Sequence, residues 1–267
     1  MLGTRRFAVV TGATGGIGSA ICRQLHDDGY EILAQYRSNH EKAETLGRWI
    51  QGDGGHFQSI VCDLRTVEGV NAVVRAVAAL VENSSEIEVH SLVNNAAILL
   101  GPSFDEATVD EFDEYFAVNV RAPFFLAQGI SRLMSADGSI VNISSASAYF
   151  SSPGDIVYAM SKAALESLTR NMAEAIAGSG LRVNSVVPGF TDNGHEAFRN
   201  AAAREYMSSF SVLGDVADPR IVADAVSFLV SDRSSRTTGT VLDVTGGSTL
   251  GARKRAVASV RQLLPDR

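Results

Sequence analysis

Cysteine is nearly absent from this sequence, and so are long apolar runs. Only two of the 267 residues are cysteines, Cys22 and Cys62, and they fall in segments with helix-like and strand-like patterns. Buried free thiols in a reducing compartment are therefore favoured over a disulfide. No apolar run approaches the roughly 18 residues of a membrane span, and the N-terminus lacks the apolar core of a signal peptide. We therefore expect a cytoplasmic protein that does not enter a membrane.

Positive charge is also in short supply. Lysine and arginine number 23 against 30 aspartates and glutamates, which gives a net charge of −7. This balance does not indicate a general nucleic-acid or anionic-membrane surface. The G-x-S-x-G motif of many hydrolases is missing. The histidines have neither catalytic-triad nor metal-ligand spacing; they are His26, His40, His56, His90 and His195. We expect neither a hydrolase nor a metal site, and a small molecule as the partner.

What the sequence does contain is a regular alternation of strand-like and helix-like segments. Short, β-branched apolar segments predict strands over 7–10, 31–35, 57–61, 89–93, 139–143, 182–187 and 240–244. Helical periodicity falls between them, over 17–28, 41–51, 66–82, 109–134, 156–177 and 218–230. Alternation of this kind predicts an α/β protein with seven parallel strands and helices on both faces. A single domain over 1–250 accounts for all of it.

A glycine-rich turn joins the first predicted strand to the first helix. Its spacing, from Gly12 through Gly16 to Gly18, is G-x-x-x-G-x-G, without the G-K-[ST] ending of a nucleoside-triphosphate loop. Glycines allow the backbone to approach a pyrophosphate, whose charge is stabilised by the free N–H groups at the helix N-terminus. Glycines at a tight turn need no ligand, but the strand-to-helix position favours a dinucleotide site in a doubly wound Rossmann fold.

The end of the second strand indicates which dinucleotide binds. An NAD site would place an acidic residue here to hold the ribose 2′-hydroxyl, but Glu31 lies at the wrong end of the strand. Arg37 instead offers a guanidinium fork suited to a 2′-phosphate; the alternative is a solvated arginine. Asp63 ends the third strand, where a carboxylate can meet an adenine amino group. Asn94 ends the fourth, where an amide can bond a neighbouring strand or a ribose.

Three polar side chains come together after the fifth strand. Ser145 lies just beyond that strand, and Tyr158 and Lys162 stand four residues apart on one helix face. An ammonium about 4 Å from a phenol favours the phenolate by up to roughly 4 kcal/mol at an effective dielectric near 20. Half of that lowers a tyrosine pKa of about 10 by one to two units. Tyr158 is therefore a candidate acid/base, although Y-x-x-x-K alone also describes ordinary helix residues.

Two further segments depart from regular periodicity. Asn119, close to Pro123 in the predicted helix over 109–134, suggests a local irregularity of that helix. Residues 191–215 have no clear period and contain several aromatic residues, so we expect a lid over a cleft. The basic segment 251–267 is expected to be a solvated extension.

Together these motifs resemble the classical short-chain dehydrogenases/reductases over nearly the whole chain. The motifs are TGATGGIG, YRSN, DL, NNAA, Asn119, Ser145, YAMSK and VVPG, in that order. The resemblance implies NADPH as cofactor and a catalytic tetrad of Asn119, Ser145, Tyr158 and Lys162. It implies that the cofactor contacts Gly12, Thr14, Gly16, Ile17, Gly18, Arg37, Ser38, Asp63, Leu64, Asn94, Ala96, Tyr158, Lys162, Pro188, Gly189 and Thr191.

The resemblance also implies a mechanism and an assembly. In it the nicotinamide gives hydride to a carbonyl carbon while Tyr158 protonates the oxygen, which Ser145 holds. Lys162 would lower the phenol pKa and anchor the ribose, and Asn119 would position a proton-relaying water. Members of the family are usually homodimers or homotetramers. Two positions depart from the family pattern. After Pro188-Gly189 the family usually continues x-I-x-T, whereas this chain reads Phe190-Thr191-Asp192-Asn193, and Ala97 stands where glycine is usual.

The substrate follows less directly. YRSN and TGTVLDVTGG are nearest to the 3-oxoacyl-carrier-protein reductases, but Gly178-Ser179-Gly180 replaces a basic residue found in those enzymes before the sixth strand. Tyr149 and Phe150, with Leu99 and Leu100, suggest an apolar, cyclic ketone. The candidate substrates are therefore a 3-oxoacyl thioester, a polyketide and an apolar cyclic ketone. The alternatives are an NADP-binding regulator or scaffold without chemistry, and an alcohol or sugar dehydrogenase working in the oxidative direction.

Overall fold

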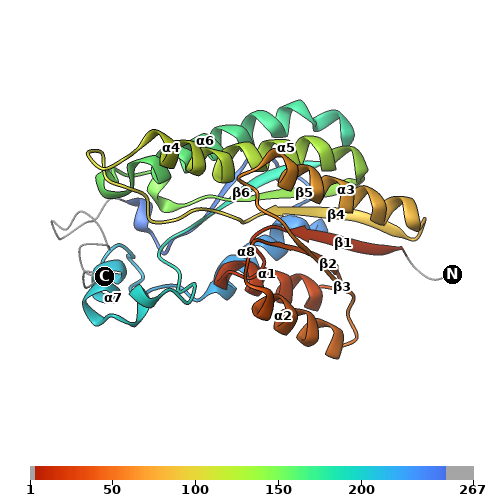
Figure 1. Ribbon diagram of the computed structural model, residues 1–267, viewed down its shortest axis with the longest axis horizontal. Coiled ribbons are helices and arrows are strands. Elements are labelled where there is room, and N and C mark those ends of the chain that lie inside the picture. The colour runs from red at the N-terminus through yellow and green to blue at the C-terminus, as the bar shows by residue number, and fades with distance from the viewer. Residues whose placement is uncertain (1–3, 251–267) are drawn as a thin grey trace.

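A computed structural model describes residues 4–250, which form one parallel sheet with helices on both faces (Figure 1). The strand order is β3-β2-β1-β4-β5-β6-β7. The strands are β1 (Arg5–Val10), β2 (Glu31–Tyr36), β3 (Phe57–Val61), β4 (Ile87–Asn94), β5 (Met134–Ile143), β6 (Arg182–Pro188) and β7 (Val241–Val244). Because the order reverses between β1 and β4, the carboxyl ends of these two strands border the crevice where such sheets bind ligands. The predicted seven-stranded, doubly wound fold is confirmed.

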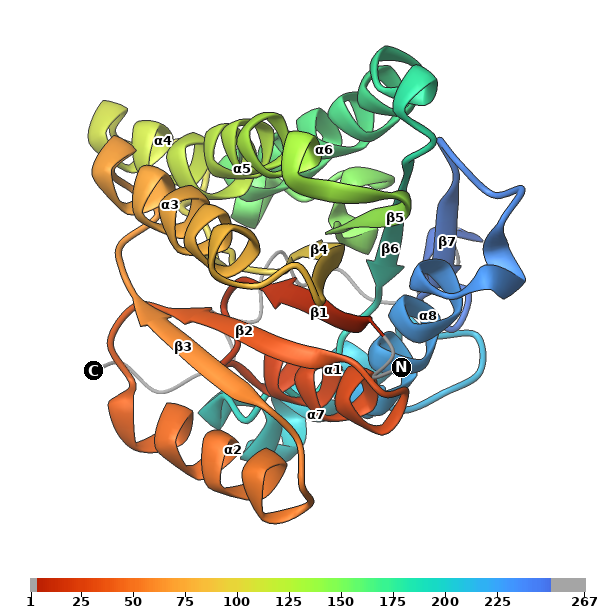
Figure 2. The ribbon, with the colours of Figure 1, turned by 90° about the vertical axis from the view of Figure 1, so that its right-hand side faces the viewer.

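The helices form two layers, which Figure 2 shows on opposite sides of the sheet. One layer contains α1 (Gly16–Asp27), α2 (His40–Gly52) and α8 (Pro219–Val230); the other contains α3 (Val67–Asn83), α4 (Val109–Phe116), α5 (Ala122–Ile130) and α6 (Ile156–Ala175). The short helix α7 (Ala201–Ser208) lies beyond the end of the sheet (Figure 1). None of the helices within residues 4–250 is long and apolar enough to cross a bilayer.

Strand β1 shows why the sequence needs two layers. Ala8 and Val10 pack in the core beneath α1 and α8, whereas Phe7 and Val9 pack in the core beneath α3 and α5. All four side chains are fully buried, because successive side chains of a strand point to opposite faces. A strand that is apolar on both faces is stable only when both faces are covered.

The predicted helix over 109–134 is wrong as a single element. A capping box of Thr108 and Glu111 starts α4, and a π-helical turn over Ala117–Arg121 then separates α4 from α5. The irregularity expected at Asn119 is therefore confirmed. The helix also ends before Met134, which already belongs to β5 and pairs with Val89. Sequence periodicity missed this because Met134 to Gly138 lacks the β-branched residues that marked 139–143 as a strand.

The lid segment is more ordered than its sequence suggests. It contains a 3₁₀ turn over Glu196–Arg199 and helix α7, whose N-cap Asn200 accepts a hydrogen bond from the Ala203 N–H. Its buried apolar residues form a small cluster of their own, separate from the two cores of the sheet. Eight residues give only two helical turns, too few for a clear period. The extension over 251–267 lies outside the described residues.

Candidate active site

A cavity of about 810 Å³ opens at the carboxyl ends of the central strands. The glycine turn and the residues that follow β2 line one end. The segments after β4, β5 and β6, together with the lid, line the other. Of the predicted site residues only Asn94 and Asn119 are not part of its wall. The topology therefore brings sixteen of the eighteen into one space.

The glycine turn is held so closely that side chains do not fit. Gly12 has φ +64°, and a Cβ there would lie 2.8 Å from the Cα of Ala96. A Cβ at Gly18 would collide with the Gly12 carbonyl oxygen, and one at Gly16 would lie 2.5 Å from the Cα of Asn193 in the lid. The backbone of the turn therefore faces the cavity without side chains covering it, as a pyrophosphate site requires.

Two residues to which no role was assigned from the sequence fix this turn: Gln35, which belongs to no motif, and Asn95 of the NNAA motif. Gln35 accepts a hydrogen bond from the Gly12 N–H at 3.0 Å, and the Asn95 amide donates to the Thr11 carbonyl at 2.9 Å. The Thr11 hydroxyl accepts hydrogen bonds from the backbone N–H groups of Asn95 and Ala96, both at 3.0 Å. Polar residues at strand ends were visible in the sequence, but which of them bond the turn depends on strand order.

The far end of the cavity is basic. Arg37 is exposed and lines it with Ser38 and Lys42, a second cation that sequence analysis did not single out. Tyr36, by contrast, is buried, and its hydroxyl lies 3.0 Å from Nδ1 of His40. Two cations at this end fit a doubly charged phosphate group better than a ribose hydroxyl.

Asp63 and Asn94 both have protein partners. The Arg65 guanidinium donates to the Asp63 carboxylate at 2.6 and 2.9 Å, which holds the pKa of that carboxyl below its usual range. Asp63 still lines the cavity, next to Leu64. The Asn94 amide is buried and donates to Oδ1 of Asn142 at 2.8 Å, so it bonds the neighbouring strand and its side chain does not face the cavity. Asn94 takes the first of the two roles its position allowed.

Tyr158, Ser145 and Lys162 meet in the middle of the cavity wall. Tyr158 lies in the first turn of α6, and the Ser145 hydroxyl is hydrogen-bonded to its phenol. Ser145 Oγ also lies 2.9 Å from Oγ of Ser147. Lys162 is buried and its ammonium donates to the Ile143 carbonyl at 2.7 Å. Strand end, loop and helix start thus gather the three groups as predicted.

The predicted direction of the Tyr158 pKa is wrong. Burial raises the pKa of this phenol to about 12, and the hydrogen bond from Ser145 lowers it only in part. The Lys162 Nζ lies 5.8 Å from the centre of the tyrosine ring and is bonded to a carbonyl. It therefore has less effect on the phenol than an ammonium about 4 Å away would have. Tyr158 keeps its proton throughout the neutral range.

A buried carboxylate one turn further along α6 was also missed. Glu166 accepts a hydrogen bond from the Ser185 hydroxyl, with oxygen–oxygen distances of 2.9 and 3.0 Å, and also bonds the Tyr149 phenol. Burial lowers the pKa of Lys162 to about 8, and the negative charge of Glu166 opposes this decrease. Tyr149, expected to face a ketone, does not line the cavity.

Asn119 does not line the cavity but forms hydrogen bonds with segments that do. Its amide oxygen accepts a hydrogen bond from the Ile98 N–H at 2.9 Å, and its amide nitrogen donates to the Ile98 carbonyl at 3.2 Å and to the Ser161 hydroxyl at 3.0 Å. The side chain is fully buried. It therefore ties the loop after β4 to α6, and Val118 is the residue of this segment that lines the cavity.

The segment after β6 continues the wall into the lid. Pro188, Gly189 and Thr191 all line the cavity. The Thr191 hydroxyl donates to the Gly189 carbonyl at 3.1 Å. A Cβ at Gly189 would lie 2.8 Å from the Thr245 carbonyl oxygen, so glycine is required where this loop passes β7.

Aromatic side chains cover the remaining end of the cavity. The rings of Phe190 and Tyr206 each lie 5.1 Å from that of Phe210, centre to centre, and the ring of Phe150 lies 5.7 Å from it. All four line the cavity with Phe198, Leu99 and Leu100. Phe150, Leu99 and Leu100 were predicted here. Phe198, Tyr206 and Phe210 come from the lid, and Phe190 directly precedes it.

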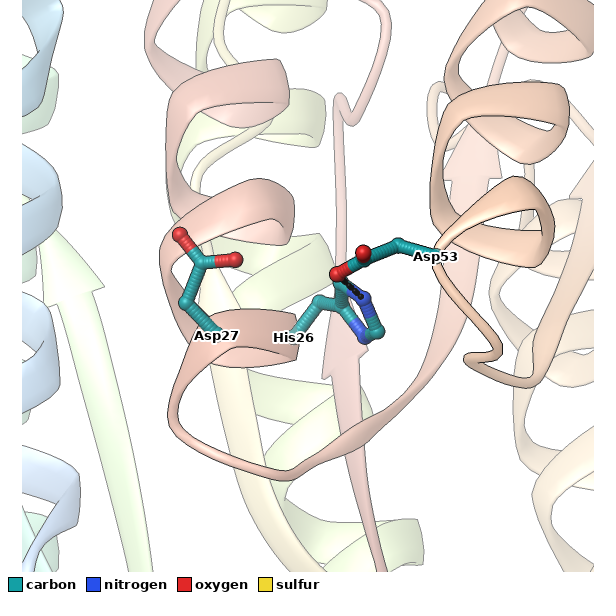
Figure 3. A group of neighbouring side chains, drawn as sticks. All are labelled: His26, Asp27 and Asp53. Carbon is teal, nitrogen blue, oxygen red and sulfur yellow. Dashed lines mark hydrogen bonds and ion pairs between the residues drawn. The ribbon is translucent and has the colours of Figure 1, made fainter.

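One group of side chains that could hold a metal ion occurs in the described part of the chain, and none of its members lines the cavity: His26, Asp27 and Asp53 (Figure 3). His26 Nε2 lies 3.2 Å from the Asp53 carboxylate, whereas the figure draws no bond to Asp27. The His26 ring also packs edge-on against Trp49 at 5.7 Å. His26 thereby joins the end of α1 to α2, which accounts for its position without an ion.

The fold and the cavity together define a dinucleotide-binding α/β protein with a Ser–Tyr–Lys group beside the glycine turn. A family model described as enoyl-(acyl carrier protein) reductase matches residues 12–249. The 3-oxoacyl-acyl-carrier-protein reductase FabG of Rickettsia conorii is 32% identical over 246 residues, which cover 91% of this chain and 97% of the relative.

Solved structures agree with this class. The angucycline C-6 ketoreductase LanV with bound NADP has a TM-score of 0.88 and 34% identity, over 94% of this chain and 97% of the other. The reductase LugOII, described as promiscuous and as catalysing keto-reduction at C1 in lugdunomycin biosynthesis, has a TM-score of 0.88 and 35% identity, over 94% and 99%. The chain belongs to the short-chain dehydrogenase/reductase family and is an oxidoreductase.

Proposed function

We propose that this protein reduces a ketone to a secondary alcohol with NADPH, and that Tyr158 is the proton donor. The observation that carries the proposal is the position of a protonated phenol, bonded to Ser145, in the same cavity as the glycine turn. The 3-oxoacyl and angucycline reductases among the relatives support the same reaction class.

The residues present fit NADPH. The bare backbone of the glycine turn, where Cβ atoms at Gly12 and Gly18 have no room, would hold the pyrophosphate. Arg37 and Lys42, with Ser38, would hold the 2′-phosphate at the basic end. Pro188 and Thr191 would lie against the nicotinamide end. When bound, NADPH supplies the hydride that a carbonyl carbon accepts.

The protein residues manage the proton and the oxygen. The Ser145 hydroxyl and the Tyr158 phenol both face the cavity, so both can donate to one carbonyl oxygen. As negative charge develops on that oxygen, Tyr158 gives up its proton. The ammonium of Lys162, held by the Ile143 carbonyl, then stabilises the phenolate left behind.

The pH dependence of reduction is expected to reflect Lys162. Burial lowers the pKa of this ammonium to about 8, so the charge is present below pH 8 and is lost as the pH rises through it. Because Tyr158 has a pKa of about 12, its own ionisation does not limit this range. We expect kcat to stay level below about pH 8 and to fall above it.

Glu166→Gln removes the charge that opposes this decrease, so the falling limb should move to lower pH. Glu174→Gln, an exposed position on the same helix, is the matched control and should leave the limb in place. Initial rates of NADPH oxidation between pH 6 and 10 measure both. A limb that moves equally in the two variants, or in neither, contradicts the role given to Glu166.

For the substrate we infer a flat cyclic ketone, of the kind found in aromatic polyketides. Tyr206 and Phe210 of the lid line the cavity together with Phe190, which directly precedes the lid, and such rings pack well against fused ring systems. The angucycline reductase LanV and the lugdunomycin reductase LugOII support this choice over a linear 3-oxoacyl thioester.

The test is NADPH oxidation over a panel that contains 1-tetralone, 1-decalone, a naphthoquinone and acetoacetyl thioesters. Turnover of the cyclic ketones with a higher kcat/KM than the thioesters supports the inference. Turnover of the thioesters alone would place the enzyme with the 3-oxoacyl reductases. NADPH binding without turnover of any ketone would indicate a cofactor-binding protein without this chemistry.

We also infer a homo-oligomer that associates through α5 and α6, which lie side by side in both ribbon views (Figures 1 and 2). Phe124 and Phe125 of α5 are 43% and 47% exposed, and Met160 of α6 is 46% exposed, so this side of the protein carries apolar surface. Sedimentation should show a multiple of 28.3 kDa at micromolar concentration. Phe125→Glu should weaken the assembly, and a wild-type protein of only 28.3 kDa would contradict it.

A further inference from the structure

The mechanism above gives no role to Asp155, an ionisable residue of the cavity. Asp155 lines the cavity and precedes the first turn of α6, which contains Tyr158. It occupies the N-cap position of α6, where an aspartate ordinarily accepts a hydrogen bond from the helix backbone. Its side chain makes no such bond, although the N-cap side chains of α2 and α8, Asn39 and Asp218, do.

No protein group takes the place of that backbone bond. Within residues 4–250 the structure gives the Asp155 carboxyl no hydrogen bond and no ion pair. Burial alone raises its pKa to about 6, so it is mostly ionised at neutral pH. Its charge acts on Tyr158, which it makes harder to ionise. Water can reach this partly buried carboxylate through the open cavity, so a bound molecule that displaces the water must itself supply a hydrogen-bond donor, or the charge is left unpaired at a cost in free energy.

The residues around Asp155 indicate what kind of molecule would donate this hydrogen bond. Tyr158 marks the place of the ketone carbonyl, and Asp155 lies one helical turn before it on the same wall. The lid end of the cavity is lined by aromatic rings, among them Phe150 and Phe210. A ring system held there brings its substituents near Asp155. A carboxylate accepts hydrogen bonds and donates none, so it selects a substituent that carries an O–H.

We propose that Asp155 determines substrate specificity by accepting a hydrogen bond from a phenolic or enolic hydroxyl group of the ketone. This inference rests on the proposed ketone reduction and adds a second point of recognition to it. Ser145 and Tyr158 hold the carbonyl oxygen, and Asp155 fixes how the rest of the ring system lies relative to that oxygen. A hydroxylated substrate is thereby oriented at two points and an unhydroxylated one at only one.

The test compares substrates that differ by one donor. Hydroxy-1-tetralones are paired with the methoxy-1-tetralones that carry the substituent at the same carbon, because the ether keeps the oxygen and removes the O–H. For at least one position we expect wild-type enzyme to have a kcat/KM about tenfold higher for the hydroxyl compound, which corresponds to one hydrogen bond to a charged group. Asp155→Ala should reduce that ratio to about one, and Asp155→Asn should give an intermediate ratio, since the amide is an uncharged acceptor.

Two controls separate recognition from folding. Asparagine is as good an N-cap as aspartate, so Asp155→Asn should keep α6 intact, which circular dichroism and the melting temperature check. Asp218→Asn makes the same chemical change at the N-cap of α8, where the side chain does cap the helix, and it should keep the wild-type ratio. The proposal is overturned if no position shows a hydroxyl preference in the wild type, or if Asp155→Ala keeps that preference.

A binding measurement keeps this inference distinct from the proposed reaction. If wild-type enzyme reduces neither member of any pair, ketone reduction of this class is wrong, and calorimetric titration of the NADP⁺-loaded protein with naphthols and their methyl ethers still tests Asp155. Tighter binding of a naphthol that disappears in Asp155→Ala supports the hydroxyl site. Equal binding of naphthol and ether overturns it.

Discussion

Tyr158→Phe is expected to lower kcat by about 10² to 10⁴-fold, the usual contribution of a positioned acid/base group. The variant loses one hydroxyl, the one that is bonded to Ser145 and keeps its proton because burial raises its pKa to about 12. The ring remains, so the packing of α6 and the affinity for NADPH should change little. Rates of NADPH oxidation at saturating ketone and a fluorescence titration with NADPH measure the two effects separately.

A second tyrosine of the same cavity provides the control. Tyr206 lies on the lid, packed against Phe210, and Tyr206→Phe removes the same hydroxyl group from a different part of the cavity wall. Its kcat should change by less than about tenfold, because the group does not serve as the acid. A Tyr158→Phe enzyme that retains more than about a tenth of wild-type turnover, with chemistry rate-limiting, would refute the assignment of the proton donor.

Arg37→Gln should reduce the preference for NADPH over NADH by about 10²-fold. Hydrogen bonds to charged groups contribute roughly 1.5 to 3 kcal/mol each, and 1.4 kcal/mol is a factor of ten. A guanidinium that binds a phosphate through two such bonds therefore accounts for that preference. The ratio of kcat/KM values for the two cofactors is the measurement, and Tyr158 chemistry should survive, because the change lies at the opposite end of the cavity.

The structure decides which variants isolate this effect. Replacing Tyr36 by aspartate would mimic an NAD site, but Tyr36 is only 7% exposed and bonded to His40, so its loss would disturb the core as well. Lys42→Gln should lower the preference further, since Lys42 also lines this end. Arg48→Gln, at an exposed position of α2 outside the cavity, should have no effect. A wild-type enzyme that prefers NADH would make Arg37 a solvated arginine.

Site residues could be predicted from the sequence where local geometry allows only one residue type or one spacing. Gly12 and Gly18 lie where a Cβ has no room, and Lys162 stands four residues after Tyr158 on one helix, so spacing alone placed them. The order of apolar segments likewise predicted the sheet, because both faces of each central strand are buried.

What could not be predicted depends on contacts between distant segments. Glu166 looks like any helix glutamate until Ser185 of β6 is found beside it. The raised pKa of Tyr158 follows from burial, which a local i,i+4 argument does not include. Asp155 resembles an ordinary N-cap, and only the structure shows that its side chain is not used as one. Tertiary packing decides each of these cases.

The π-helical turn over Ala117–Arg121 has a consequence for the tolerance of this chain to insertions and deletions. Such a turn accommodates about one residue more than an α-helical turn, and each residue advances a helix by roughly 100°. Because the extra residue is absorbed in one wider turn, the five residues rotate the chain by about as much as four α-helical residues would. Deleting one residue here would therefore restore regular α geometry and leave the direction of α5 relative to α4 nearly unchanged. A deletion within the first turn of α5 has no such compensation: it would rotate the rest of the helix by roughly 100° and turn Leu126 and Ile130, which are fully buried, away from the sheet. Natural loss of a single residue is therefore expected to be tolerated better in the π-helical turn than in α5.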